Sequence, residues 1–272
     1  MTPTIIDPRS LPVRVSRLKK MALTPKHYFE ACQGNVDEPT LAMRFGTLGH
    51  ARLWPEAAVP YAIYDGERRG HAWKDFAAKH ADKQIFTIKE VDRADDLAEA
   101  IDKHPDASKL VRLGEPERHI EWSYLDRAFS SRLDVYGPST VVELKTCRSS
   151  HPDWFVRDGI RLGHHVQCAA YRLAVAHLTG KRPQDIDVVI VAAESARPHV
   201  VTVFEMEDDD LLQGERALRA WMERLLVCEA ANHWPGYVEQ RVRFHVPDPD
   251  EQALLFDDDE DNSTEDDERQ AA

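Results

Sequence analysis

A continuous run of apolar residues in the last third of the chain constrains the fold more than any other feature. Residues 187–193 read DVVIVAA, so every side chain after the first is apolar. A strand that faces water on one side alternates apolar and polar residues, whereas an unbroken apolar run is typical of a strand covered on both faces. We therefore expect an α/β fold, with a central mixed β-sheet flanked by helices.

The other elements can be assigned from the spacing of apolar residues and from turn-forming residues. Gly137-Pro138-Ser139 separates two β-type runs and predicts a hairpin-like connection. In chain order, the pattern predicts helices at 16–32 (restarting at Pro25), 40–54, 68–80 and 89–103, strands at 118–125, 131–136 and 140–146, a helix at 164–178, strands at 187–193 and 199–206, and a helix at 207–231. This order favours a single mixed domain over several separate ones.

Charge is distributed unevenly along the chain. Residues 247–272 contain 12 acidic residues and one basic residue, which leaves 36 acidic and 34 basic residues elsewhere. The acidic, low-complexity composition predicts a disordered tail at 247–272. Before it, we expect an irregular lead-in at 1–15 and one domain at 16–246. Because the body is nearly neutral, the net charge of −13 does not exclude a local basic groove for nucleic acid.

The chain carries no feature of a secreted or membrane protein. No run reaches the ~18 apolar residues of a membrane span, and the N-terminus lacks an apolar signal core. The four cysteines, at positions 32, 147, 168 and 228, form no CxxC pair, which favours reduced thiols over a zinc or iron–sulfur site. We expect a soluble cytoplasmic protein with no membrane partner.

Three charged residues in neighbouring β-type runs form the main candidate site. Glu143 and Lys145 are two positions apart in one run, so their side chains share a face of the strand. The hairpin connection can place Asp134 beside that face. Two carboxylates bind a hard cation such as Mg²⁺, and the carbonyl of Leu144 is a further candidate ligand. An ordinary ion pair at a strand end is the alternative interpretation of this pattern.

Two other motifs lie on predicted helices. His50 ends the sequence GTLGH in the helix at 40–54. Gln167 and Tyr171 are four residues apart in the helix at 164–178, and therefore share one face, to which His164 also belongs. Each motif by itself is compatible with simple packing of the helix against a core.

The order GTLGH, RLD, VVELKT and HHVQCAAY resembles the PD-(D/E)xK nuclease superfamily, in the branch with RecB-type nuclease domains and RecE-like exodeoxyribonuclease VIII. The resemblance covers roughly residues 16–237 and implies a single restriction-endonuclease-like domain. One departure is Glu143, where RecE-like chains often have Asp; both side chains bind metal. The iron–sulfur members use cysteines near both ends of the domain, so no cluster is expected here.

The resemblance also implies roles for individual residues. Metal ligands would be His50, Asp134, Glu143 and the Leu144 carbonyl, with Mg²⁺ as cofactor and Mn²⁺ as an alternative. Lys145 would position or activate water. DNA contacts or support of the site would come from Gln167, Tyr171, His165 and Arg132. Glu121 would be an outer or second-metal carboxylate, with a surface salt-bridge partner as an equal alternative, and Arg132 has the alternative of a plain surface arginine.

The implied activity is a Mg²⁺-dependent DNA exonuclease of phage or bacterial recombination or repair, which degrades linear duplex DNA from the 5′ end. Such enzymes are homo-oligomers and deliver a 3′ single strand to a single-strand annealing protein. Three alternatives stay open. They are a nuclease of the same fold for single strands or flaps, a non-catalytic DNA-binding protein on a decayed nuclease fold, and an unrelated enzyme with a chance motif.

The acidic tail contains one apolar segment. Residues 252–256 read QALLF, and Gln252, Leu255 and Phe256 resemble the short peptide by which bacterial replication proteins bind the sliding clamp. A disordered segment with two or three apolar anchors is suited to binding in a groove. A helix that packs on the protein's own body, or chance, explains the same residues.

Overall fold

A computed structural model describes residues 5–35, 38–244, 246 and 248. The contacts divide the chain into one compact unit that ends at Gly236 and a second that begins at Tyr237. The described residues of the second unit contain no helix or strand. The candidate clamp peptide at 252–256 and the predicted disorder of the tail lie outside the described residues, and the predicted domain end at 246 stays a prediction.

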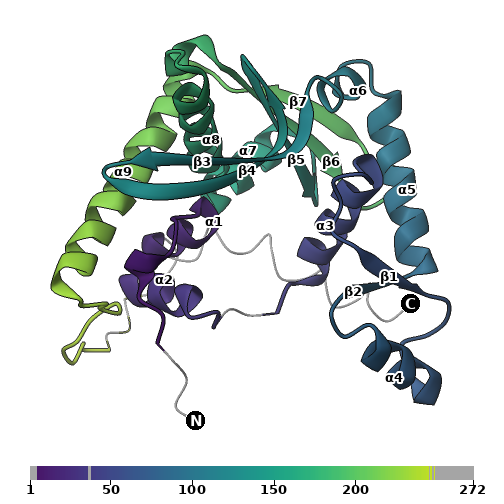
Figure 1. The fold of residues 1–272 in the computed structure, drawn as a ribbon, viewed down its shortest axis with the longest axis horizontal. Coiled ribbons are helices and arrows are strands. Elements are labelled where there is room, and N and C mark those ends of the chain that lie inside the picture. Colours follow the sequence, from purple (N-terminus) through teal and green to yellow (C-terminus); the bar gives the residue numbers. More distant parts are fainter. Residues whose placement is uncertain (1–4, 36–37, 245, 247, 249–272) are drawn as a thin grey trace. The chain divides into compact units, whose positions relative to one another are not determined.

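The first unit is built on a five-stranded mixed sheet with strand order β3-β4-β5-β6-β7. Neighbouring strands are antiparallel except for β5 and β6, which run parallel (Figure 1). The strands are β3 (Glu115–Tyr124), β4 (Arg127–Gly137), β5 (Thr140–Cys147), β6 (Asp187–Glu194) and β7 (Val201–Glu205). This confirms the mixed α/β fold with a central sheet.

Strand β6 is covered on both faces, as its unbroken apolar sequence predicts. Ile190 and Ala192 belong to one buried cluster, and Val191 and Ala193 belong to another on the opposite face. Alternate residues of a strand point to opposite faces, so the two clusters are the two layers of the core. Each layer therefore needs its own set of covering helices.

Two groups of helices cover the sheet (Figure 1). One group, with α8 and α9, packs on the face of Ile190; the other, with α3 and α5, packs on the face of Val191. The helices of the unit are α1 (Val15–Leu18), α2 (Pro25–Cys32), α3 (Leu41–Leu53), α4 (Gly70–Lys79), α5 (Ile88–Lys103), α6 (Ala107–Leu110), α7 (Pro152–Leu162), α8 (His164–Thr179) and α9 (Asp208–Ala231).

The N-terminal segment is irregular but packed. Val13 is fully buried and forms a parallel bridge with Phe129 of β4. Further along, the restart at Pro25 is confirmed: Thr24 caps α2, with its hydroxyl accepting a hydrogen bond from the His27 backbone N–H, and Pro25 takes the first helical position. These contacts fix α1 beside the β3–β4 hairpin.

The sequence patterns do not predict four of the α-helices and strands. They are the parallel strands β1 (Tyr61–Tyr64) and β2 (Gln84–Thr87), and the helices α6 and α7. The structure also extends β3 and β4 into a long hairpin, whose turn residues Leu125 and Asp126 both have positive φ angles, 48° and 59°. Two consecutive positive φ values are the geometry of a two-residue hairpin turn. Within the described part of the chain, no helix has the length and apolar character that crossing a membrane requires.

Candidate active site

The candidate site lies where strand β4 separates from strand β5. The two strands pair only over 135–137 and 140–142, after which β4 continues in its pairing with β3. At the first unpaired position, Asp134 Oδ2 accepts a hydrogen bond of 2.8 Å from the Leu144 backbone N–H. The Asp134 carboxylate thus replaces the backbone carbonyl that would accept this hydrogen bond if the two strands stayed paired. Beyond this point the strands separate and leave an opening in the sheet.

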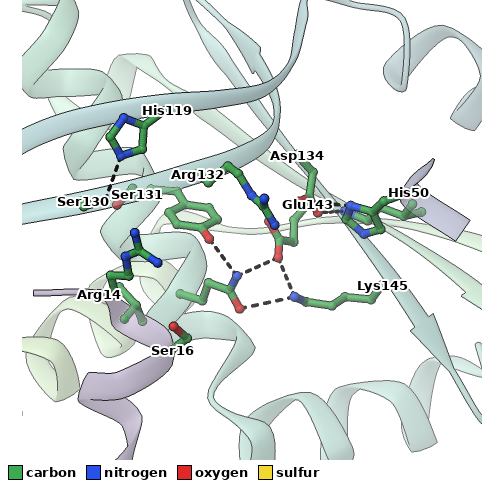
Figure 2. A pocket seen from close by; sticks show the side chains of 14 residues that line it. Arg14, Ser16, His50, His119, Ser130, Ser131, Arg132, Asp134, Glu143 and Lys145 are labelled. Atoms are coloured by element: carbon green, nitrogen blue, oxygen red, sulfur yellow. Dashed lines mark hydrogen bonds and ion pairs between the residues drawn. The ribbon is translucent and has the colours of Figure 1, made fainter. Parts of the chain in front are cut away.

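Glu143 and Lys145 lie on the other side of this opening, on the face covered by α8. Lys145 Nζ donates to Glu143 Oε1 at 2.5 Å and to Gln167 Oε1 at 3.2 Å. The Gln167 side-chain amide donates to the same Glu143 oxygen at 2.8 Å and to the Tyr171 hydroxyl at 3.0 Å. The dashed lines between Glu143 and Lys145 in Figure 2 mark the first of these contacts. Glu143 and Lys145 of β5 therefore form one hydrogen-bonded network with Gln167 and Tyr171 of α8.

His50 reaches the opening from α3, on the opposite face of the sheet. Its Nδ1 lies 3.0 Å from Glu117 Oε1 and 3.6 Å from Asp134 Oδ1. Close packing of α3 allows this approach, because a Cβ atom at Gly46 would lie only 3.1 Å from the Thr146 hydroxyl oxygen. Gly46 of the GTLGH motif therefore lets α3 lie close to β5 and so helps to position His50.

Glu117 is a site residue that the sequence pattern did not reveal. It lies opposite Asp134, between the pairs that join Pro116 to Val135 and Arg118 to Leu133. Its φ angle of 52° is unusual for a residue in a strand, and it interrupts the ladder at this point. A turn-forming stretch around Pro116 hid this position from strand prediction, and no motif marks it.

The residues present fit a divalent metal ion. His50, Glu117 and Asp134 each offer one ligand atom, and these atoms lie within 4.8 Å of one another. Glu143 is 1% exposed, and its Oε2 atom has no hydrogen-bond partner among the described residues. A buried carboxylate oxygen without a partner is costly unless a cation satisfies it. Leu144, whose carbonyl is a further candidate ligand, lines the same cavity.

Burial and neighbouring charges shift the pKa values of the site. Burial and the nearby Asp134 charge raise the pKa of Glu143 to about 7. Burial alone lowers the pKa of Lys145, but the carboxylates of Glu143 and Asp134 outweigh it and raise that pKa above its ordinary value. The pKa of His50 is raised in the same way: burial lowers it, and Asp134 and Glu117 more than offset the effect. The carboxylates gathered at the site therefore favour the charged forms of Lys145 and His50.

A polar cavity of about 410 Å³ opens onto this site. Besides His50, Asp134 and the network of Glu143 and Lys145, the cavity is lined by Arg14 and Ser16 from the α1 region and by His119 and Ser130 from the hairpin (Figure 2). His119 Nε2 lies 2.8 Å from the Ser130 hydroxyl oxygen. The sequence motifs mark none of Arg14, His119 and Ser130 as site residues, and Ser16 only as the start of the helix predicted at 16–32.

Lys19 brings a second ammonium group to the network, again unanticipated from the sequence. Its Nζ donates to the Leu162 carbonyl at 3.1 Å and approaches Gln167 Oε1 at 3.5 Å. Burial, followed by repulsion from Lys145, lowers the pKa of Lys19 to about 8. Gln167 therefore lies between two lysines, which orients its amide group so that the oxygen faces both ammonium groups and the nitrogen faces Glu143.

The remaining predicted residues are placed differently from one another. Arg132 lines the cavity, and its Nε lies 2.9 Å from Glu117 Oε2. Glu121 is exposed on β3 opposite Ser130 and is not among the residues that line the cavity. His165, two positions before Gln167 on α8, is also not among the residues that line the cavity. Burial lowers the pKa of His165, and the carboxylate of Asp210 on α9 partly offsets this effect. Among the predicted site residues that the structure describes, all but Glu121 and His165 therefore line the polar cavity.

The sequence matches the profile of the "PDDEXK-like domain of unknown function (DUF3799)" over residues 14–242. The chain belongs to this family. The match includes every element of the site, from Arg14 to Tyr171, and it confirms the PD-(D/E)xK-like fold that the motif order indicated. A search of curated proteins finds no significant match.

The solved structures that match this chain include two that are named as exonucleases. A "Putative exonuclease" from Eubacterium rectale is 15% identical, with a TM-score of 0.60, and the match covers 88% of this chain and 92% of that one. An alkaline exonuclease from Laribacter hongkongensis is 13% identical, with a TM-score of 0.28, covering 69% and 93% of the two chains. At such identities the first similarity supports the fold of the DUF3799 chain, and the second adds nothing to it.

Proposed function

We propose that this DUF3799 protein is a metal-dependent deoxyribonuclease that degrades linear DNA from its ends. The observation that carries the proposal is the convergence of His50, Glu117 and Asp134 beside the buried Glu143–Lys145 pair. Three potential metal-ligand side chains next to a carboxylate and an ammonium group can together support metal-assisted hydrolysis of a phosphodiester. A decayed fold would have no reason to retain all five.

The reaction is the attack of water on a phosphodiester phosphorus, with cleavage of one P–O ester bond. The attacking water loses a proton, and the leaving sugar oxygen gains one. A bound divalent cation would neutralise phosphate charge and lower the pKa of the attacking water. His50, Glu117, Asp134 and the unpaired Oε2 of Glu143 would hold that cation. Mg²⁺ suits the carboxylates, and the imidazole makes Mn²⁺ an equally reasonable choice.

Lys145 acts as a charged group in this proposal. Its raised pKa keeps the ammonium group protonated at neutral pH, so it is poorly suited to remove a proton from water. Two of its N–H groups are directed to Glu143 and Gln167, which leaves the third for a phosphate oxygen or the attacking water. Lys145 therefore stabilises the charge that develops on the phosphate, and Gln167 fixes its position.

The polar cavity supports attack at the end of a strand. Arg14, Ser16, His119 and Ser130 can hold the phosphate and sugar of a terminal nucleotide next to the metal ligands. The 5′ to 3′ direction is carried over from the resemblance to RecE-like exonucleases, as is a role in phage or bacterial recombination and repair. Cytoplasmic location, a homo-oligomeric state and a single-strand annealing partner are proposals of the same origin.

An end-labelled cleavage assay tests the proposal. Linear duplex DNA labelled at the 5′ or the 3′ end is incubated with the wild-type protein in Mg²⁺, Mn²⁺ or EDTA. A closed circular duplex serves as the control for attack away from ends. The proposal requires metal-dependent loss of the 5′ label before the 3′ label, with the circle intact. Early loss of the 3′ label would reverse the direction, and cleavage of the circle would make the enzyme an endonuclease.

A further inference from the structure

A second cavity, of about 640 Å³, adjoins the candidate active site. It shares His50, Arg132, Leu144 and Lys145 with the polar cavity, so the two meet at the proposed metal ligands. Its volume lies in the range of about 300–1,000 Å³ that is usual for sites that bind small organic groups. A strand of DNA whose phosphate is cleaved between the cavities would have to place the neighbouring nucleotides in this second space.

The wall of the second cavity is mainly apolar, unlike that of the first. One face of α3 forms one side, with Met43, Thr47 and His50 spaced four and three residues apart. The segment before β1, with Val59, forms another side. Met43 is 63% exposed and Val59 is 67% exposed. These two side chains therefore present apolar surface to whatever enters the cavity.

Cationic groups are present at the same cavity. Arg132 and Lys145 line it beside the metal ligands, and Lys83 lines it together with the carboxylate of Asp82. An apolar wall next to cationic groups matches the chemistry of unpaired nucleotides, whose bases expose flat apolar faces and whose phosphates are anionic. Bases within a duplex are stacked and present only their edges, so a duplex gains little from such a wall.

We propose that this cavity, referred to as the α3 groove, binds the bases of unpaired nucleotides next to the scissile phosphate. The ligand is a free single-stranded segment of DNA. The inference rests on the proposed nuclease function for its biological meaning, because the groove adjoins the site of that function. The binding itself does not require cleavage, so the two claims can be tested separately.

A matched pair of variants on α3 tests the groove. Met43→Glu places a negative charge in the groove, whereas Leu41→Glu places the same charge two residues away on the same helix, outside the groove. Leu41 is 68% exposed, close to the value for Met43. Glu is a good helix former, so both variants should fold, which thermal unfolding by circular dichroism checks. Val59→Glu tests the other wall independently.

Binding is measured by fluorescence anisotropy in EDTA, with a labelled oligothymidylate and a blunt-ended duplex as separate probes. We expect Met43→Glu and Val59→Glu to weaken oligothymidylate binding by about tenfold, because each adds a carboxylate that repels the phosphates and removes apolar surface from the wall of the groove. Leu41→Glu should change it little, and duplex binding should change little in all three variants. Three results would overturn the inference. They are an equal loss of oligothymidylate affinity in Leu41→Glu, an equal loss of duplex affinity in the groove variants, and unchanged oligothymidylate affinity in the groove variants.

Hydrolysis of thymidine 5′-(p-nitrophenyl) phosphate separates this inference from the proposed function. This substrate carries one phosphodiester and one base, so it can reach the metal ligands without filling the groove. We expect Leu41→Glu, which lies outside the groove, to hydrolyse it as fast as the wild type, and Met43→Glu to lose far more activity on oligonucleotides than on this substrate. A wild-type protein that binds oligothymidylate through the groove but cleaves neither substrate would contradict the proposed function alone. Normal cleavage of oligonucleotides by Met43→Glu would contradict the groove alone.

Discussion

The carboxylate of Asp134 accepts a hydrogen bond of 2.8 Å from the backbone N–H of Leu144 at the point where β4 leaves β5. Asp134 therefore has two roles that different substitutions can separate. It satisfies a buried backbone donor, and it supplies a charged ligand atom near His50 and Glu117. The first role supports the fold at the opening of the sheet, and the second concerns the metal.

We predict that Asp134→Ala destabilises the protein more than Asp134→Asn. The alanine leaves the buried Leu144 N–H without an acceptor, which costs about 1–3 kcal/mol, whereas the asparagine oxygen can still accept that bond. Both variants should lose metal-dependent activity, because neither has a charged ligand at this position. Urea denaturation and an activity assay on the same preparations measure the two effects. Equal stability of the two variants would show that the hydrogen bond does not contribute.

Glu117→Gln should weaken metal binding, whereas Glu121→Gln should not. Both residues lie on β3, but only Glu117 contacts His50 and shares a potential metal site with Asp134. Loss of one charged ligand should lower Mn²⁺ affinity by about tenfold or more, comparable with the loss of a group that supports a metal site. Isothermal titration calorimetry of both variants measures this. A larger loss in Glu121→Gln than in Glu117→Gln would reverse our assignment of the third carboxylate.

The contrast between these two glutamates shows what the sequence could and could not reveal. Glu121 belongs to a recognisable β-type run beside aromatic residues, so it was selected, but its side chain is exposed away from the cavity. Glu117 lies next to Pro116 and adopts a positive φ angle, a conformation that no propensity argument assigns to a strand residue. Its position depends on the register between β3 and β4, which is a long-range property.

The parts that could be predicted have local or strongly repeated signals. β6 was recognised by its unbroken apolar run, and α8 by the spacing of Val166, Ala170 and related residues. The four motifs indicate Glu143, Lys145 and Gln167 as site residues, and the structure joins the three in one network. Helix α7 was missed even though Pro152 and Gly163 mark its two ends. Strands β1 and β2 have four residues each, too few for a periodic pattern.

Lys145→Ala should abolish most of the activity while retaining metal binding. The ammonium group is directed to Glu143 and Gln167 and is not itself a ligand for a cation. Loss of one group that stabilises transition-state charge costs about 10²–10³ in kcat. Its matched control is Lys103→Ala, which removes an exposed lysine of α5 that lines neither cavity. Cleavage rates and Mn²⁺ titrations of both variants are the measurements. Loss of Mn²⁺ binding in Lys145→Ala alone would assign Lys145 a structural role at the metal site.

His164 should make the folded state less stable in mild acid. Burial and the charges of Lys145, Lys19 and His165 lower the pKa of His164 from 6.5 to about 3. Below about pH 6.5 the unfolded chain binds a proton that the folded state does not, so stability falls as the pH decreases toward 3. The slope from this one group is at most about 1.4 kcal/mol per pH unit.

The matching variant is His164→Gln, which cannot titrate. Its free energy of unfolding, measured in urea at several pH values, should decrease less between neutral pH and about pH 5 than that of the wild type. The difference between the two proteins isolates the contribution of His164 from those of other titrating groups. Parallel pH profiles for the two proteins would show that His164 does not carry this dependence.

The central claim is that the opening between β4 and β5 is the active site of a metal-dependent nuclease. The most direct measurement is the release of nucleotides from linear DNA by the wild type and by Glu143→Gln, each in Mn²⁺ and in EDTA. Glu143→Gln keeps the side-chain shape and changes only the buried carboxylate that faces Lys145 and Gln167. We predict release by the wild type in Mn²⁺ alone, and none by the variant. Equal release by both proteins, or release that persists in EDTA, would contradict the account.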